Sequence, residues 1–184
     1  MRVAVALGSN LGDRGAHLAW AVGELSRIIS ALVVSEPIET KPVGEGVEHD
    51  PDFLNAVAVG QSDLAPAALV AALLDIERRR GRERPYPNAP RTLDLDLILA
   101  GDRIVREPGA QVPHPRFRER RFVLEPLASI APEMVDPVTG LTVAKLLERL
   151  NEQGAPLRGA LQTQSAVERK KAPRKGRLTN PEWP

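Results

Sequence analysis

The 184 residues of the sequence are enough for a single domain with a sizeable hydrophobic core. The formal net charge is only +1, so bulk charge gives no support for a nucleic-acid-binding or membrane-binding protein. The sequence has no cysteine, which excludes disulfide bonds and thiolate metal sites.

No stretch of the sequence predicts a targeting peptide or a membrane span. The apolar run at residues 3–7 is interrupted by Gly8 and is too short for a signal peptide. No apolar stretch approaches the length of a membrane-spanning helix. We therefore expect a soluble cytoplasmic protein.

The N-terminal part predicts a strand, a turn and a helix. Residues 3–7 are typical of a buried strand, and residues 8–13 of a tight turn. Such a turn can hold phosphate, but it matches neither the P-loop nor the dinucleotide motif, so we interpret it as structural. Asp13 is expected to cap a helix. The apolar residues at helical spacing are Leu18, Val22, Leu25, Ile28 and Ile29.

The next segment predicts two strands joined by a long loop. Residues 32–38 and 53–59 have strand-like patterns. Residues 40–51, rich in glycine, proline and acidic residues, predict a lid or binding loop in which His49 is solvent-exposed. On the second strand, the polar Asn55 lies among apolar neighbours, so it must bond either a nearby loop or a ligand. Its face of the strand also carries Phe53, Val57 and Val59.

A second helix is expected after residues 62–63, which we predict to cap it, with Pro66 in its first turns. Gly81 is expected to end this helix. The loop that follows is flanked by arginines that are candidates for phosphate contact. These arginines are Arg82, Arg84 and Arg91.

The most informative stretch is residues 92–100, which alternate as a strand with two different faces. Leu93, Leu95, Leu97 and Leu99 are expected on one face, and Thr92, Asp94, Asp96 and Ile98 on the other. The two aspartates would stand about 6–7 Å apart. Their repulsion is relieved by a retained proton or by a bound cation such as Mg²⁺. The alternative is a solvated face of an edge strand.

The segment after this strand contains a turn, a rigid histidine and a basic cluster. Residues 101–105 predict a hairpin partner for the aspartate strand. His114 lies between two prolines, on a stiff segment suited to hydrogen bonding with a ligand. The cluster could bind RNA or nucleotide phosphates, or be surface charge. Its members are Arg116, Phe117, Arg118, Arg120, Arg121 and Phe122.

The C-terminal part predicts two more helices, around residues 122–130 and 142–153. Beyond them the apolar periodicity fades and the composition becomes basic and rich in proline and glycine. We therefore predict one domain at residues 1–157 and a disordered basic tail at residues 158–184.

Five sequence blocks together resemble the 6-hydroxymethyl-7,8-dihydropterin pyrophosphokinase family of folate biosynthesis. The most specific block is Arg-Thr-Leu-Asp-Leu-Asp, and the resemblance spans about residues 2–150. The blocks lie at residues 8–12, 51–56, 90–96, 112–115 and 120–127. The resemblance implies an α+β, ferredoxin-like antiparallel sheet with helices packed on it and mobile catalytic loops. It also implies a monomer that transfers pyrophosphate from ATP to the pterin and binds neither nucleic acid nor membrane.

The resemblance also implies roles for individual residues. Asp94 and Asp96 match the ligands of two Mg²⁺ ions, and Arg82 and Arg91 match residues that aid the chemistry. The pterin-side positions are Thr40, Pro42, Val43, Phe53, Asn55 and Phe122. The ATP-side positions are Glu77, Arg82, Arg84, Arg91, Ile98, His114 and Arg120.

The sequence departs from the family at a few positions and leaves two other functions open. Asn88 replaces a tryptophan that is common in the family, and Pro115 and Arg116 stand where an aromatic is common. An RNA-binding module would explain the Arg/Phe cluster and the basic tail. A Mg²⁺-dependent phosphohydrolase would use the same carboxylates but would consume ATP without a pterin acceptor.

Overall fold

The described part of the chain alternates between strands and helices. The computed structural model describes residues 1–42, 50–82 and 89–154, so the predicted boundary at residue 157 and the predicted tail lie outside the described residues. The elements are β1 (Arg2–Ser9), α1 (Arg14–Leu25), β2 (Ser30–Val34), β3 (Ile38–Thr40), β4 (Phe53–Gln61), α2 (Pro66–Arg79), β5 (Asp94–Ala100), β6 (Val105–Glu107), β7 (Ala110–Val112), η1 (Phe117–Glu119), α3 (Arg121–Ile130) and α4 (Val143–Gly154).

The main sheet has the topology expected of a ferredoxin-like fold. Its strands are ordered β2-β4-β1-β5, all pairs are antiparallel, and the short β3 pairs with β4. The chain order β1-α1-β2-β4-α2-β5 is the β-α-β-β-α-β unit of that fold. The predicted α+β fold class is therefore confirmed.

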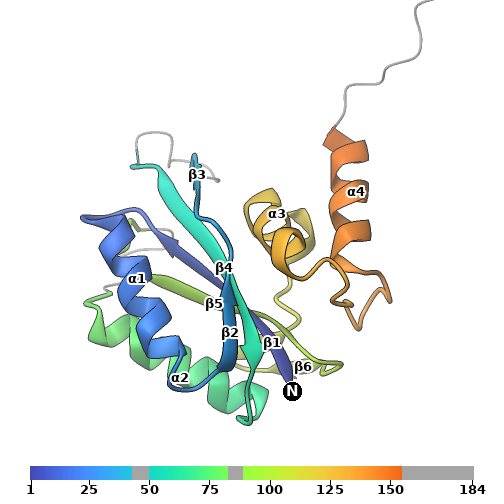
Figure 1. Cartoon of the computed structure of the whole chain (residues 1–184), viewed down its shortest axis with the longest axis horizontal. Helices are drawn as coiled ribbons and strands as arrows, with labels where there is room; N and C mark the ends of the chain where they lie inside the picture. Colours follow the sequence, from blue (N-terminus) through green and yellow to red (C-terminus); the bar gives the residue numbers. More distant parts are fainter. Residues whose placement is uncertain (43–49, 83–88, 155–184) are drawn as a thin grey trace, which may run out of the picture. The chain divides into compact units, whose positions relative to one another are not determined.

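The two faces of the sheet are covered differently (Figure 1). One apolar cluster joins α1 and α2 to the first face, through residues such as Leu25, Leu73 and Leu97. A second cluster joins η1, α3 and α4 to the opposite face, through residues such as Phe117 and Leu127. Part of this second face carries polar residues, including Asn55 and Asp96, and lines a cavity.

A bulge in the β1–β5 pairing divides β5 into a polar half and an apolar half. Ala4 pairs with Leu99 but Val5 pairs with Leu97, so the register shifts at this point. As a result, Leu99 belongs to the second cluster together with Ile98. The prediction that Leu99 shares a face with Leu97 is therefore wrong, because the extra residue turns the strand.

Other predicted details also differ from the structure. The segment after residue 101 is not a partner of β5; β6 pairs with β7 in a separate hairpin. Ser62 does not cap α2, since its hydroxyl donates to the carbonyl of Ile28 at 3.1 Å. The predicted strand at residues 32–38 is split between β2 and β3. By contrast, Asp13 caps α1 by accepting from Ala16 N–H at 2.9 Å, and Gly81 follows α2 with a φ of 77°.

Within the described ranges, every helix falls short of the length and apolar content that a bilayer-spanning segment needs.

A buried ion pair fixes the segment that leads into α3. The Asp136 carboxylate is fully buried and accepts two hydrogen bonds of 2.7 Å from Arg118, which follows Phe117 in η1. It also accepts from Thr139 Oγ1 at 2.6 Å. Burial acts to raise the pKa of Asp136, but these hydrogen bonds outweigh it and the pKa lies below the usual value.

Replacing Asp136 with asparagine should destabilise the protein by roughly 3 kcal/mol near neutral pH, because the half-buried Arg118 guanidinium loses its charged partner. Since the folded-state pKa of Asp136 is depressed, its contribution is complete above the unfolded value of about 4. It is lost as the pH falls through the folded-state value. Urea unfolding of both proteins between about pH 7 and pH 2.5 measures this, and equal stabilities at neutral pH would contradict it.

Candidate functional site

A cavity of about 500 Å³ lies on the polar part of the second sheet face. Its lining comes from β1, β3, β4 and β5 and from the segment that joins η1 to α3. The polar, charged and aromatic residues of the lining are Thr40, Lys41, Phe53, Asn55, Arg91, Asp94, Asp96, Arg116, Glu119, Arg120, Arg121 and Phe122. A space of this size suits a small-molecule ligand.

The floor of the cavity is a row of residues across three adjacent strands. Gly8 on β1 pairs with Asn55 on β4 and with Asp94 on β5. A Cβ atom at position 8 would lie 3.0 Å from Asn55 Oδ1 and 3.8 Å from Asp94 Cβ. Glycine at this position therefore keeps the space between the amide and the carboxylate open.

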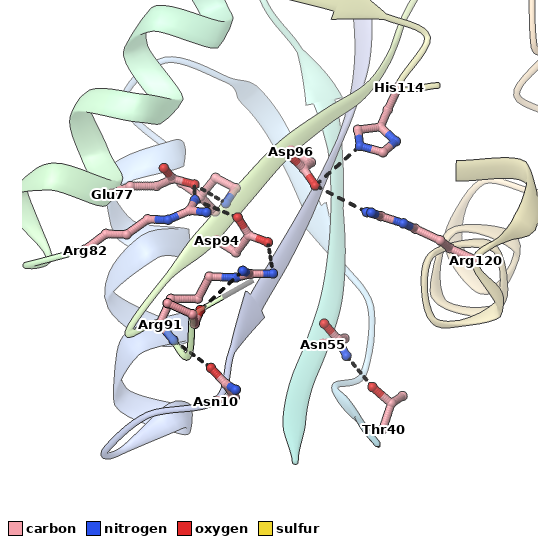
Figure 2. Close-up of polar contacts among 12 residues, drawn as sticks. Asn10, Thr40, Asn55, Glu77, Arg82, Arg91, Asp94, Asp96, His114 and Arg120 are labelled. Carbon is pink, nitrogen blue, oxygen red and sulfur yellow. Dashed lines mark hydrogen bonds and ion pairs between the residues drawn. The ribbon is translucent and has the colours of Figure 1, made fainter. Parts of the chain in front are cut away.

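Asp94 is held by two arginines, one before and one after residues 83–88, which lie outside the described part of the chain. Its Oδ1 lies 2.6 Å from Arg82 Nη1, and its Oδ2 lies 3.1 Å from Arg91 Nη2 (Figure 2). Glu77 on α2 is 2% exposed, pairs with Arg82, and accepts from Leu95 N–H at 2.7 Å. Glu77 therefore fixes α2 to β5 and holds Arg82 against Asp94.

Asp96 is compensated less closely than Asp94. Its Oδ2 lies 3.7 Å from His114 Nε2 and 3.6 Å from Arg120 Nη1. Burial raises the pKa of Asp96, and the neighbouring Asp94 carboxylate raises it further, while His114 and Arg120 oppose the rise. Burial also lowers the pKa of His114, against the effect of Asp96. Among the described residues, the carboxylate of Asp96 is thus less well compensated than that of Asp94.

The other end of the cavity presents an amide and aromatic rings. Asn55 Nδ2 donates to Thr40 Oγ1 at 2.7 Å, so this side chain bonds the end of β3 (Figure 2). The guanidinium of Arg91 lies 5.2 Å from the centre of the Phe53 ring, and that of Arg120 lies 5.6 Å from the Phe122 ring. The two aromatic residues therefore lie beside the two arginines that approach the carboxylates.

The structure brings most of the predicted site residues together. Among the described residues, those that line the cavity are Thr40, Phe53, Asn55, Arg91, Asp94, Asp96, Arg120 and Phe122. Arg82 and His114 contact the carboxylates from the side, and Glu77 holds Arg82. Pro42 follows β3 and is half-buried. Val43, Arg84, Asn88 and His49 lie outside the described residues.

Ile98 occupies a different environment from the other predicted ATP-side residues. It is fully buried in the apolar cluster with Phe117 and Val123, and it is not among the residues that line the cavity. Its backbone carbonyl accepts from His114 N–H at 3.0 Å. In this structure Ile98 therefore supports the His114 segment from below the cavity.

Sequence reasoning missed several residues that line the cavity or hold its rim. Gly8 and Asn10 belong to the turn that we interpreted as structural, and only three-dimensional pairing places them beside β5. Lys41 lies at the start of the predicted loop. Arg116, Glu119 and Arg121 also line the cavity. The two arginines belong to the basic cluster, and the close spacing of arginines in that cluster was the sequence feature that could have identified them.

The carboxylates fit a cation that shares its coordination with another ligand. Among the described residues, no three His, Asp or Glu side chains gather into a metal-binding group. Asp94 and Asp96 present carboxylate oxygens from one face of β5, and among the described residues Glu119 is the other carboxylate residue that lines the cavity. Magnesium is commonly bound by one or two carboxylates plus phosphate oxygens and water, so this pair suits a magnesium–phosphate ligand.

Comparisons with known proteins show the family to which the chain belongs. A model of the 7,8-dihydro-6-hydroxymethylpterin-pyrophosphokinase (HPPK) family matches residues 4–132. The chain is 38% identical over 149 residues to a Synechocystis protein named 2-amino-4-hydroxy-6-hydroxymethyldihydropteridine pyrophosphokinase, covering 80% of this chain and 75% of that protein. It is also 38% identical over 149 residues to the folic acid synthesis protein fol1 of Pneumocystis carinii, covering 80% of this chain.

The chain corresponds to one part of some of these relatives. It spans 20% of the Pneumocystis protein. A solved structure titled Plasmodium falciparum HPPK-DHPS wild type aligns with a TM-score of 0.63 at 13% identity, over 83% of this chain and 46% of that one, and shows the shared fold. On the family match and the identity to the Synechocystis enzyme, the chain belongs to the 7,8-dihydro-6-hydroxymethylpterin-pyrophosphokinase family.

Proposed function

We propose that this protein transfers a pyrophosphoryl group from ATP to the hydroxymethyl oxygen of 6-hydroxymethyl-7,8-dihydropterin, giving the pterin diphosphate and AMP. The observation that carries the proposal is one cavity with two chemically different ends. One end has the carboxylates of Asp94 and Asp96 with arginines beside them, and the other has Asn55 with two phenylalanine rings. The first end suits a magnesium triphosphate and the second a flat heterocycle.

The pterin binds at the Asn55 end of the cavity. A pterin ring has hydrogen-bonding edges and a flat face, which match an amide and an aromatic ring. Asn55 is anchored to Thr40 through its nitrogen, so its oxygen remains available to accept a hydrogen bond from the ligand. Phe53 and Phe122 offer ring faces. Pro42 and Val43 complete the pterin-side set that family resemblance implies.

The triphosphate binds at the carboxylate end. Arg82, Arg91 and Arg120 supply guanidinium groups that hold phosphate oxygens and stabilise the charge that develops during transfer. His114 lies beside Asp96, and Glu77 keeps Arg82 in position. Family resemblance also assigns Arg84 to ATP binding, but this residue lies outside the described residues. Two Mg²⁺ ions held by Asp94 and Asp96 would neutralise phosphate charge and align the phosphates with the acceptor.

The proposal is tested by incubating the protein with ATP, Mg²⁺ and the hydroxymethyl dihydropterin and measuring AMP. We expect AMP and the pterin diphosphate in equal amounts, and no AMP when the pterin is omitted. ATP consumption at the same rate without a pterin would instead indicate a phosphohydrolase. Salt-sensitive RNA binding without any AMP formation would indicate an RNA-binding module.

Replacing Asp96 with asparagine should lower the rate of transfer by about a thousandfold, because a magnesium ligand contributes several kcal/mol to stabilising the transferring phosphates. Steady-state AMP formation at saturating ATP and pterin measures the loss. Lys145→Ala, on the exposed side of α4, is a matched surface control that should leave the rate unchanged. An Asp96→Asn protein with normal turnover would remove Asp96 from the metal site.

The same Asp96 variant should be more stable than the wild type when Mg²⁺ is chelated. Since the folded-state pKa of Asp96 is raised, its ionised form opposes folding at all pH values above that pKa. The gain in melting temperature should be present at neutral pH and vanish as the pH falls below the unfolded value of about 4. Calorimetry in chelator tests this, and a variant that melts below the wild type at neutral pH would contradict it.

Replacing Asn55 with alanine should weaken pterin binding about 10- to 100-fold and leave ATP binding nearly unchanged. The variant removes an acceptor from the pterin end and frees Thr40, which costs about 1–3 kcal/mol for groups left unpaired. Titration calorimetry with each ligand separately gives both affinities. A greater loss of ATP affinity than of pterin affinity would remove Asn55 from the pterin site.

A further inference from the structure

We propose that Asn10 is a positioning residue that fixes Arg91 for the transfer step and ties it to the pterin side of the cavity. This inference rests on the proposed function. Asn10 lies in the turn after β1, is 2% exposed, and is not among the residues that line the cavity. It therefore acts through the residues that it holds, and it does not contact the substrates itself.

The backbone of Arg91 is bonded to Asn10 on both sides. Arg91 N–H donates to Asn10 Oδ1 at 2.7 Å, and Asn10 N–H donates to the carbonyl of Arg91 at 3.1 Å (Figure 2). Arg91 lies in the short described segment that precedes β5. The pairing of β5 with β1 begins only at Asp94, so sheet hydrogen bonds do not hold Arg91. The position of its Cα therefore depends on Asn10.

The same amide also bonds the segment that leads into β4. Asn10 Nδ2 donates to the carbonyl of Pro51 at 3.3 Å. Pro51 lies just before β4, two residues from Phe53. The guanidinium carbon of Arg91 lies 5.2 Å from the centre of the Phe53 ring. These contacts close a ring through Asn10, Pro51, Phe53 and Arg91. A shift at either Pro51 or Arg91 is thus transmitted to the other.

The guanidinium of Arg91 reaches the carboxylate end of the cavity, and one of its nitrogens has no partner there among the described residues. Nη2 lies 3.1 Å from Asp94 Oδ2, and Nη1 donates to the Ala89 carbonyl at 3.4 Å. Its Nε is buried without a hydrogen-bond partner among the described groups. The backbone bonds to Asn10 fix where the Arg91 side chain starts, and the contacts of its guanidinium with Asp94 and Phe53 can form only from that position.

The neighbouring contacts argue against a role of Asn10 that is limited to stabilising the fold. Arg14 independently ties the start of β4 to β3, since it donates to the Asp52 carbonyl at 2.9 Å and pairs with Glu39 at 2.6 Å. The β3–β4 connection therefore keeps an anchor when Asn10 is changed. Losing the Asn10 side chain should displace Arg91 and Phe53 more than it unfolds the sheet.

The test is a double-mutant cycle in the AMP assay with Asn10→Ala and Arg91→Ala, alone and together. If Asn10 acts through Arg91, Asn10→Ala should lower kcat about 100-fold in the wild-type background, as expected for a displaced catalytic group. In the Arg91→Ala background, the same change should lower kcat less than about threefold. Equal losses in both backgrounds, or an unchanged kcat, would overturn the proposal.

Ser62→Ala is the matched control for loss of stability. Ser62 is also 2% exposed and also bonds backbone groups, at the far end of β1 and β4 from Asn10. It should lower the melting temperature to a similar degree and leave kcat unchanged in both backgrounds. A drop in kcat with Ser62→Ala that matches its loss of stability, in parallel with Asn10→Ala, would overturn a positioning role.

If Asn10→Ala does not fold, Asn10→Asp takes its place in the same cycle. The aspartate keeps an acceptor for Arg91 N–H but cannot donate to the Pro51 carbonyl and repels it. It should raise the KM for the pterin several-fold, with a smaller loss of kcat than Asn10→Ala would give. An unchanged KM would overturn the link to Pro51. Absence of AMP with the wild type would overturn the proposed function, and this inference with it.

Discussion

The site depends on an unequal compensation of two carboxylates on one strand face. Asp94 lies within 3.1 Å of two arginines, whereas the nearest basic groups to Asp96 are the guanidinium of Arg120 at 3.6 Å and the imidazole of His114, whose pKa is lowered by burial, at 3.7 Å. Burial and the neighbouring Asp94 raise the pKa of Asp96 above its ordinary value, so its ionised form is less stable than that of a free aspartate. Under the proposed function, a cation bound beside Asp96 would relieve this imbalance.

The fold creates this arrangement by letting one strand serve two purposes. Before the bulge, β5 presents Asp94 and Asp96 to the cavity; after it, Ile98 and Leu99 are buried beneath α3. The apolar half is fixed by packing, so the polar half is held rigidly beside β1. Gly8 keeps the space between Asn55 and Asp94 open across β1, so both side chains lie on one floor of the cavity. Under the proposed function, the spacing of the pterin and phosphate ends is therefore set by the geometry of the sheet.

Sequence patterns predicted the elements whose signal is local. Alternation identified the aspartate strand, and Asp13 was identified as a cap from its position before a helical pattern. The face of Leu99 was predicted wrongly because a bulge leaves no mark in the alternation itself. The hairpin after β5 was assigned to the wrong partner because turn residues do not specify which strand pairs. Asn10 could not be identified as a link, since its partners are 41 and 81 residues away.

The arginines around Asp94 also indicate how the site can accept a highly charged nucleotide without losing charge balance. Arg82 and Arg91 are paired with a carboxylate, so each guanidinium is neutralised before any phosphate arrives. Under the proposed function, Asp94 would hold the cation, and Arg82 and Arg91 would then pair with phosphate oxygens, so that every charge would keep a partner. Such an exchange requires guanidinium groups that turn without moving their backbone. The backbone of Arg82 is held because its N–H donates to the carbonyl of Glu77 at 3.1 Å, and the backbone of Arg91 is held by its two hydrogen bonds with Asn10.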